Sequence, residues 1–234
     1  MKRFVWMATV VALVVSFAAL TLAGDCGSCK IAKSKNGWCE GCNAGFAGDQ
    51  VVKSKKLHEV LNGHAVPAEK TKAIECGGCK TGLANCQPCE GCDVYFVNGR
   101  VYTSKYAAAL ARGQKMEWPE EKYAGKVDKA TLTKDELLAK KAEYAKMKKA
   151  HVGCKGCSAA MQSAGWCSDC SVGFVGSYAY KDKLHYKQAK AASLTVMRAK
   201  ALAEKCEACA VGMLTDGSCS SCKLTFKNGK KIRL

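Results

Sequence analysis

The sequence predicts a small α+β fold in which four tandem units, each built from two cysteine pairs and a β-hairpin, are joined by short helices. The 234 residues include 17 cysteines but only 3 prolines, and this cysteine density is typical of units too small to fold by packing alone. The cysteines recur in pairs with two residues between them, and a turn signal follows each group at the same interval. These observations exclude a single large hydrophobic core.

The first 23 residues have the pattern of a removable export signal. Lys2 and Arg3 give a positive start, an apolar run covers 4–20, and small residues precede a cleavage point after Ala23. We therefore expect an exported protein, periplasmic or extracellular, with no membrane span in the mature chain. The alternative is an uncleaved N-terminal membrane anchor, because about twenty apolar residues just span a bilayer.

Four copies of one cysteine motif organise the rest of the chain. Each copy has the spacing C-x2-C-x9-C-x2-C, and a phenylalanine stands four residues after its last cysteine. We predict that all the cysteines of these copies are metal ligands. The sixteen cysteines are Cys26, Cys29, Cys39, Cys42, Cys76, Cys79, Cys89, Cys92, Cys154, Cys157, Cys167, Cys170, Cys206, Cys209, Cys219 and Cys222.

A β-hairpin is predicted after each fourth cysteine. Asn98-Gly99 and Asn228-Gly229 stand between β-prone runs, and this pair is the strongest local signal for a two-residue turn because both residues take φ > 0. Gly48-Asp49 and Gly176-Ser177 mark the same position in the other two copies. The repeated phenylalanine is predicted to cover the hairpin face over the metal site. These phenylalanines are Phe46, Phe96, Phe174 and Phe226.

Two residues between thiolates let one tight turn present both sulfurs to a single ion, and a second such turn completes a tetrahedron. The glycines before the last cysteine of a turn are suited to φ > 0; they are Gly41, Gly78, Gly91 and Gly156. In these features the chain resembles the short zinc ribbons, which implies four structural zinc sites of four cysteines each. The resemblance covers residues 26–52, 76–103, 154–180 and 206–234. The units are called ribbons 1 to 4 below.

Short helices are predicted after the first three hairpins. Ser54, Ser104 and Asp182 are suited to cap their N-termini. The expected ends lie near Gly63, Gly113 and Ala203.

The longest linker contains a capping box, Thr133-Lys-Asp-Glu136, which predicts a helix that bridges two halves of the chain. Ribbons 1 and 3 share Gly-Trp-Cys and ribbons 2 and 4 share Asn-Gly, which indicates duplication of a two-ribbon module. The predicted organisation is a signal peptide at 1–23, ribbon 1 at 24–75, ribbon 2 at 76–132, a helical linker at 133–153, ribbon 3 at 154–205 and ribbon 4 at 206–234.

A thiol oxidoreductase is one alternative for the same cysteines. Trp38-Cys39-Glu-Gly-Cys42 and Trp166-Cys167-Ser-Asp-Cys170 resemble the W-C-x-x-C motif of thioredoxin-like proteins, whose first cysteine attacks disulfides. That fold requires a strand before the motif and a long helix after it. Here another cysteine pair stands upstream and a hairpin is expected downstream, so the motif does not have its usual setting.

Iron is the alternative metal, since a rubredoxin-like electron carrier holds one iron with four thiolates on two similar turns. Residues 86–92 also resemble the C-x2-C-x2-C run of iron–sulfur ferredoxins. The other three copies have Asn36, Ala164 and Asp216 where Cys86 stands. Cys86 is therefore predicted to be a spare thiol, able to link a dimer.

Disulfides are the third alternative, and export favours them. A bridge inside C-x2-C closes a very short loop, however, and removes little entropy from the unfolded chain. Metal ligation therefore remains the preferred interpretation.

No catalytic motif is present: H-E-x-x-H, G-x-S-x-G, phosphate-loop and dinucleotide patterns are all missing from the sequence. The four histidines, His58, His64, His151 and His185, have no matched spacing. The formal charge of +17 comes mainly from lysine, and without placed arginines we expect no specific nucleic-acid binding. The predicted function is metal binding by a scaffold or interaction protein, not an enzyme, whose partner is a protein or a cell-envelope polymer.

Overall fold

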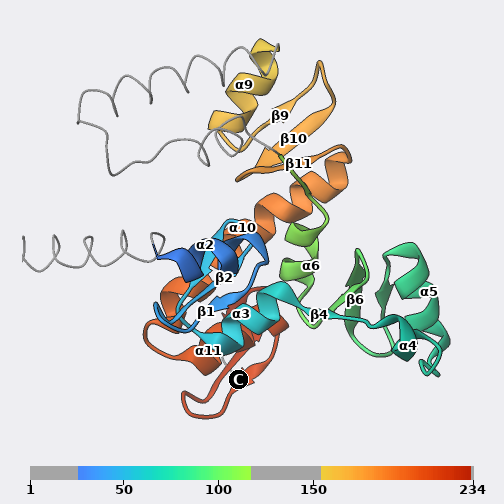
Figure 1. The fold of residues 1–234 in the computed structure, drawn as a ribbon, viewed down its shortest axis with the longest axis vertical. Helices are drawn as coiled ribbons and strands as arrows, with labels where there is room; N and C mark the ends of the chain where they lie inside the picture. Colours follow the sequence, from blue (N-terminus) through green and yellow to red (C-terminus); the bar gives the residue numbers. More distant parts are fainter. Residues whose placement is uncertain (1–25, 117–153, 233–234) are drawn as a thin grey trace, which may run out of the picture. The chain divides into compact units, whose positions relative to one another are not determined.

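The computed structural model describes residues 26–116 and 154–232 (Figure 1). Packing divides the chain into two compact units, one from residues up to Ala107 together with Val196–Leu234, the other from Ala108–Thr195. The cysteine and hairpin segments of ribbons 1, 2 and 4 (26–52, 76–103 and 206–232) belong to the first unit, and that of ribbon 3 (154–180) belongs to the second. The predicted signal peptide and the helix expected to open at Thr133 lie outside the described residues.

Every ribbon is a short helix followed by three antiparallel strands, so the predicted α+β class is confirmed. In ribbon 1 these elements are α2 (Gly27–Ser34), β1 (Trp38–Cys39), β2 (Ala44–Ala47) and β3 (Gln50–Val52). The strands form a meander in which Trp38 pairs with Gly45 and Phe46 pairs with Val51. The hairpin of β2 and β3 was expected, but α2 was not.

The other ribbons repeat this order. Ribbon 2 consists of α5 (Gly77–Asn85), β5 (Pro88–Cys89), β6 (Val94–Val97) and β7 (Arg100–Tyr102). Ribbon 3 consists of α9 (Lys155–Gln162), β9 (Trp166–Cys167), β10 (Val172–Val175) and β11 (Tyr178–Tyr180). Ribbon 4 consists of α11 (Glu207–Thr215), β12 (Ser218–Cys219), β13 (Leu224–Lys227) and β14 (Lys230–Ile232).

The three predicted linking helices are present with their predicted caps. They are α3 (Lys55–Asn62), α6 (Lys105–Ala111) and α10 (Lys183–Ala203). Ser54 Oγ accepts a hydrogen bond from the Leu57 amide at 3.0 Å, and the buried Ser104 Oγ accepts one from Ala107 at 3.2 Å. Asp182 accepts from the His185 amide at 2.6 Å. Each cap satisfies one amide that the first helical turn leaves without a partner.

Two further strands join sheets that follow them in the chain. β4 (His64–Ala65) pairs with β7 of ribbon 2, and β8 (Gln114–Lys115) pairs with β11 of ribbon 3. These two sheets therefore have four strands, in the orders β4-β7-β6-β5 and β8-β11-β10-β9, whereas ribbons 1 and 4 have three. A small helix, α4 (Ala68–Thr71), follows β4. The sequence predicted neither β4 nor β8.

The hairpin turns have the predicted backbone. Asn98 and Gly99 have φ values of 51° and 72°, and Asn228 and Gly229 have 52° and 65°. In ribbons 1 and 3 only the first turn residue, Gly48 or Gly176, is left-handed, with φ of 58° and 59°. The copies therefore use two turn geometries to make the same connection.

The repeated phenylalanine is buried in each ribbon. All four phenylalanine side chains are only 2–4% exposed. In ribbons 1, 3 and 4 the phenylalanine belongs to a buried cluster with two of the cysteines, one of which lies in the helix. The helix residue that faces it is always small: it is Ala32, Gly82, Ala160 or Gly212. A Cβ on Gly82 would lie 2.6 Å from the Phe96 ring, so close approach requires the small residue there.

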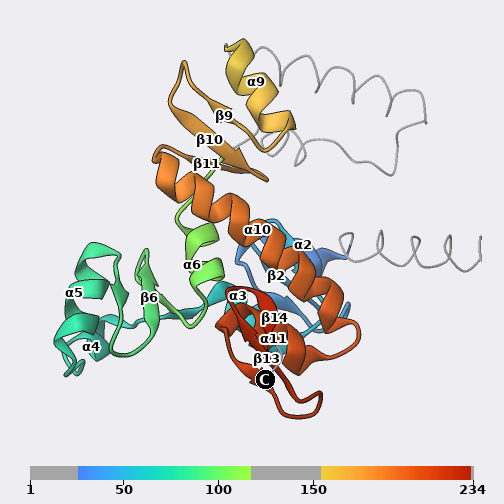
Figure 2. The ribbon, with the colours of Figure 1, turned by 180° about the vertical axis from the view of Figure 1, so that it is seen from behind.

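Within the first unit, ribbon 4 packs against the helices that follow ribbons 1 and 2. α11 lies beside α3 in both views (Figures 1 and 2). Ser54 Oγ donates to Glu207 at 2.5 Å, and Lys105 forms an ion pair with Asp216 at 2.6 Å. The linking helices therefore connect ribbons as well as following them.

Among the described helices, including the 21-residue α10, none combines the length and hydrophobicity needed to cross a membrane.

Candidate metal centres

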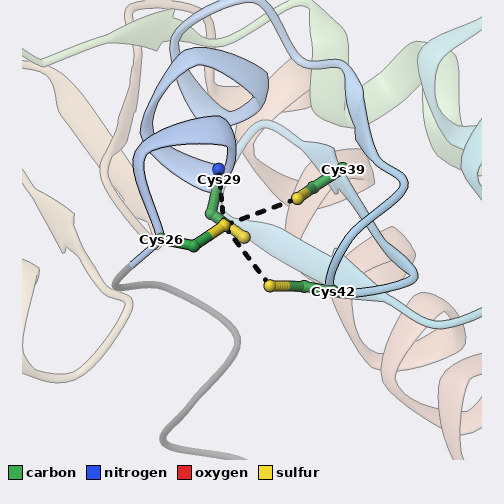
Figure 3. A group of neighbouring side chains, drawn as sticks. All are labelled: Cys26, Cys29, Cys39 and Cys42. Atoms are coloured by element: carbon green, nitrogen blue, oxygen red, sulfur yellow. Dashed lines mark hydrogen bonds between the residues drawn. The ribbon is translucent and has the colours of Figure 1, made fainter.

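The structure brings the sixteen predicted ligand cysteines together in four groups, one in each ribbon. The four Sγ atoms of every group lie within 4.8 Å of one another. Figure 3 shows the group of ribbon 1, where Cys26 and Cys29 reach the centre from α2 and Cys39 and Cys42 reach it from the β1–β2 connection. The repeated spacing in the sequence thus becomes a repeated cluster in space.

The first cysteine pair of each ribbon lies at the N-terminus of a helix. Cys26 is the N-cap residue of α2, and its Sγ accepts a hydrogen bond from the Cys29 amide at 3.2 Å. Cys76, Cys154 and Cys206 are the N-cap residues of α5, α9 and α11. Helix N-termini present unpaired amides and a partial positive charge, which stabilise a thiolate.

The second pair of each ribbon lies at the turn between the first two strands. The third cysteine ends a two-residue strand and is buried, as in Cys39, which is 2% exposed. The chain then turns through a left-handed residue directly after the fourth cysteine. These left-handed residues are Asn43, Asp93, Ser171 and Lys223, with φ between 44° and 51°.

The prediction that Gly41, Gly78, Gly91 and Gly156 take φ > 0 is wrong, because the left-handed position falls on the residue after the cysteine pair. Gly78 and Gly156 lie inside α5 and α9. A Cβ on them would lie 2.8 Å and 2.9 Å from the sulfurs of Cys89 and Cys167, so these glycines make room for a ligand atom. Ribbons 1 and 4 have Ser28 and Ala208 at that position.

The separations between sulfurs fit one tetrahedral ion in each group. In ribbon 1 the Sγ atom of Cys26 lies 3.6 Å from that of Cys39 and 3.4 Å from that of Cys42. Both corresponding pairs in ribbons 2 and 4, and the Cys154–Cys167 pair in ribbon 3, are 3.7 Å apart. A zinc–sulfur bond of about 2.3 Å gives a tetrahedron with edges of about 3.8 Å, whereas a disulfide requires about 2.05 Å. None of the seventeen cysteines is in a disulfide.

The thiols within each group have different acidities. Hydrogen bonds from Cys29, from both its side chain and its amide, lower the pKa of Cys26 to about 7. In the other ribbons the amide of the second cysteine is the main cause that lowers the pKa of Cys76, Cys154 and Cys206 to about 7. Burial raises the pKa of the second cysteine, for example Cys29. Each group therefore has one thiol that readily becomes a thiolate at neutral pH.

Each group offers four thiols as its donors, and no histidine or carboxylate within the described residues belongs to one. Four thiolates that fill a tetrahedron leave no position for a substrate, which is the arrangement of structural sites. The histidines lie elsewhere: His64 is in β4, His185 is in α10, and His151 lies outside the described residues. The His58 ring of α3 packs against Trp38 of β1, with 5.6 Å between the ring centroids.

Cys86 is exposed and lies outside the group of ribbon 2. It is the C-cap residue of α5 in a left-handed conformation with φ of 54°. Asn36, Ala164 and Asp216 have the same conformation at the same repeat position, with φ of 51°, 48° and 51°. The backbone conformation at this position is therefore the same in all four ribbons, and the additional cysteine does not change it.

Sequence reasoning missed the helix that carries the first cysteine pair. A usable signal was present, because a small residue stands three positions after the second cysteine in every copy. Three residues is one turn of a helix, so both side chains face the same side. Ala32 and Cys29 show this arrangement in α2, where both are buried.

The fold and the sites together define a repeat protein of four small α+β ribbons, each with a four-cysteine group able to hold a metal ion. Comparisons with protein-family models, with curated proteins and with solved structures found no match.

Proposed function

We propose that the protein binds four zinc ions, one in each four-cysteine group, and that the ions hold the ribbons in their folded form. The sulfur separations of 3.4–3.7 Å support this proposal most directly. They fit a tetrahedral ion and are far too long for disulfides. In each ribbon the zinc ion cross-links the N-terminus of the first helix to the turn between the first two strands.

The size of the ribbons supports a structural role for the ions. The buried centre of ribbon 1 consists of Cys29, Ala32, Cys39 and Phe46, so half of its members are ligands. Units of this size bury too little apolar surface to fold alone. In zinc-finger peptides one structural site supplies roughly 10 kcal/mol or more of folding free energy. The same is expected for each ribbon.

The proposal includes export and an interaction role. The N-terminal pattern of residues 1–23 supports export, and the absence of a catalytic motif in the sequence supports a scaffold or binding role. The partner is a protein or a cell-envelope polymer. Since the sites are closed by four thiols, the partner would contact surfaces that the ribbons present and not the metal.

The first test is metal analysis, with an absorption spectrum, of protein kept anaerobic after isolation. We expect about four zinc ions per chain and no visible absorption. Strong colour would indicate ferric thiolate sites and an electron carrier, the main alternative. If the metal-free protein reduces a disulfide substrate and the metal-loaded protein does not, a thiol oxidoreductase would be favoured instead.

Metal removal should unfold the ribbons. Chelation at neutral pH is expected to abolish the hairpin signals in far-UV circular dichroism, because the ligands are then four unlinked thiols. Acid should have the same effect: thiols must lose their protons to bind the metal, so protonation displaces the metal as the pH falls. Reduced, metal-free protein that keeps native amide-exchange protection across residues 26–52 would contradict the proposal.

A further inference from the structure

The cysteine group of ribbon 2 is the least covered of the four. Ribbons 1, 3 and 4 each bury two of their ligand cysteines, one in the helix and one at the end of the first strand. In ribbon 2 the strand cysteine, Cys89, is buried, but the helix cysteine, Cys79, is only half-buried. Its equivalents Cys29, Cys157 and Cys209 are 1–6% exposed. Small dissolved molecules therefore reach the helix side of this group more easily than in the other ribbons.

The helix that carries Cys79 is also the weakest of the four in composition. Three positions of this helix hold a glycine in at least one ribbon, and α5 has glycine at all three of them: Gly77, Gly78 and Gly82. The helices α2, α9 and α11 contain one glycine each. Glycine lowers helix stability relative to alanine because it loses more conformational freedom on folding. We therefore expect α5 to open more often than its equivalents.

Packing requires two of these glycines but not the third. A Cβ on Gly78 would lie 2.8 Å from the Cys89 sulfur, and a Cβ on Gly82 would lie 2.6 Å from the Phe96 ring. A Cβ on Gly77 would have open space around it, with nothing outside its immediate chain neighbourhood within 4 Å. Gly77 therefore weakens the first turn of α5 without making room for another atom.

Ribbon 4 shows how a side chain at the position of Gly77 can hold the helix. Glu207 is the equivalent residue, and it accepts a hydrogen bond from Ser54 Oγ at 2.5 Å and lies 3.8 Å from the Lys56 amine. The first turn of α11 is thus attached to the start of α3. Gly77 has no side chain with which to attach α5 in this way. The first cysteine pair is therefore held more weakly in ribbon 2 than in ribbon 4.

We propose that ribbon 2 is a transferable zinc site, which passes its ion to small dissolved thiols while ribbons 1, 3 and 4 retain theirs. This inference rests on the proposed binding of four zinc ions. In the first step a thiol of the acceptor bonds the ion as a thiolate, the bond from the ion to Cys79 Sγ breaks, and the proton of the acceptor passes to that sulfur. The zinc stays divalent and no electron is transferred. Repetition of this exchange at the other three cysteines leaves four thiols in ribbon 2, so the protein is a zinc donor as well as a scaffold.

The probe is 2,3-dimercaptopropanol, a small dithiol, added to the full, zinc-loaded protein under anaerobic conditions. Native mass spectrometry counts the ions per chain over time. One ion should leave about tenfold faster than the other three, which is the size of effect that two additional helix glycines are expected to have. The rate of this first loss should rise with the dithiol concentration, because the acceptor bonds the ion before the ion leaves.

A pair of glycine variants tests the role of the helix without changing a ligand. Gly77→Ala should slow the first loss about two- to fivefold, because alanine stabilises the first turn of α5 and has space there. Gly27→Ala is the matched control, since Gly27 has the same position in α2 and the same free space. It should leave the first loss unchanged.

A pair of cysteine variants assigns the fast loss to a ribbon. Cys89→Ser should abolish the fast phase, whereas Cys39→Ser, the same change in ribbon 1, should retain it. Loss of all four ions in one phase would overturn the inference, and so would a fast phase that persists in Cys89→Ser or a rate independent of dithiol concentration. These results leave the proposed function intact, whereas a chain that binds fewer than four zinc ions before the dithiol is added contradicts the proposed function itself.

Discussion

In ribbons 1 and 3 an aromatic residue of the following helix packs on the sheet over a strand glycine, and ribbon 2 lacks this contact. In ribbon 1 the His58 ring of α3 sits over Gly45 and beside Trp38, with ring centroids 5.6 Å apart. In ribbon 3 the Tyr186 ring of α10 takes the same place over Gly173, 5.5 Å from Trp166. A Cβ on Gly173 would lie 2.3 Å from the Tyr186 ring. The glycine is therefore required by the aromatic residue of the helix.

Ribbon 2 has the reverse distribution of size. Tyr95 stands where the glycines stand, Pro88 replaces the tryptophan, and Ala108 replaces the helix aromatic residue. Tyr95 lies near Lys105 and Asp216, and burial is the main cause that raises the pKa of its hydroxyl. The comparison teaches that the strand and helix positions change size together: a large residue on one goes with a small residue on the other.

The exchange also changes what the first lysine of each helix does. Lys55 and Lys183 each lie 5.8 Å from the ring centre of Trp38 or Trp166. Lys105, the equivalent residue of α6, instead contacts Asp216 at 2.6 Å and Asn228 at 2.8 Å in ribbon 4. Ribbon 2 thus uses for an inter-ribbon contact a residue that ribbons 1 and 3 use locally.

The largest expected effect tests whether Cys86 is outside the repeat. Cys89→Ser should remove one metal equivalent and unfold ribbon 2, because a three-thiolate site holds the ion poorly. Cys86→Ser should leave metal content and folding unchanged and should remove any disulfide-linked dimer. Mass spectrometry under native conditions and a non-reducing gel measure both. Loss of a metal ion from the Cys86 variant would contradict the placement of the ligand set.

The size rule is tested in ribbon 3. Gly173→Ala should destabilise it by about 1–3 kcal/mol through overpacking against Tyr186. Tyr186→Ala alone should cost more, because it removes a buried ring and its hydrogen bond to Ala164 O. In that background Gly173→Ala no longer meets the ring, so the double variant should cost less than the sum of the two single variants. Amide hydrogen exchange in 172–180 provides the measurement. Strict additivity would show that the two positions do not depend on each other.

A smaller effect is expected from the contact that ribbon 2 makes with ribbon 4. Lys105→Met should lower the free energy of unfolding by about 1 kcal/mol. The Lys105 amine forms a partly shielded ion pair with Asp216 and also donates a hydrogen bond to Asn228. The loss should decrease in high salt. Chemical denaturation at two ionic strengths measures it, and an effect independent of salt would indicate packing by the lysine stem instead.

The smallest effect is expected from the equivalent change in ribbon 1. Lys55→Met removes an ion pair with Glu40 between two well exposed side chains and a contact with Trp38. Exposed pairs and exposed cation–π contacts are worth about 0.5 kcal/mol or less. A Lys55→Met cost as large as that of Lys105→Met would remove the distinction between the ribbons.

Local and repeated features could be predicted from the sequence. The hairpins follow from Asn-Gly pairs, the caps from Ser54, Ser104 and Asp182, and the four cysteine groups from spacing alone. Each of these depends on residues close together in the chain or on a pattern present four times. Repetition made a weak local signal decisive.

The features that were missed depend on distant partners. β4 and β8 are two residues long, and His64-Ala65 or Gln114-Lys115 has no strand propensity that distinguishes it from a loop. Their pairing is set by the exposed edges of β7 and β11. The left-handed residue was predicted at the wrong position. The sequence shows glycines near the cysteines, but it does not show whether a glycine is needed for a positive φ or to leave space for a sulfur atom.

The strands β4 and β8 place the beginning of a ribbon well before its first cysteine. A fragment of ribbon 2 cut at Glu75 would lose the strand that covers Val101, whereas one that starts at Gly63 would keep it. The unit that can be moved, swapped or duplicated intact is therefore offset from the unit marked by the cysteines. A recombination joint placed directly before Cys76 or Cys154 separates a sheet from its own outer strand.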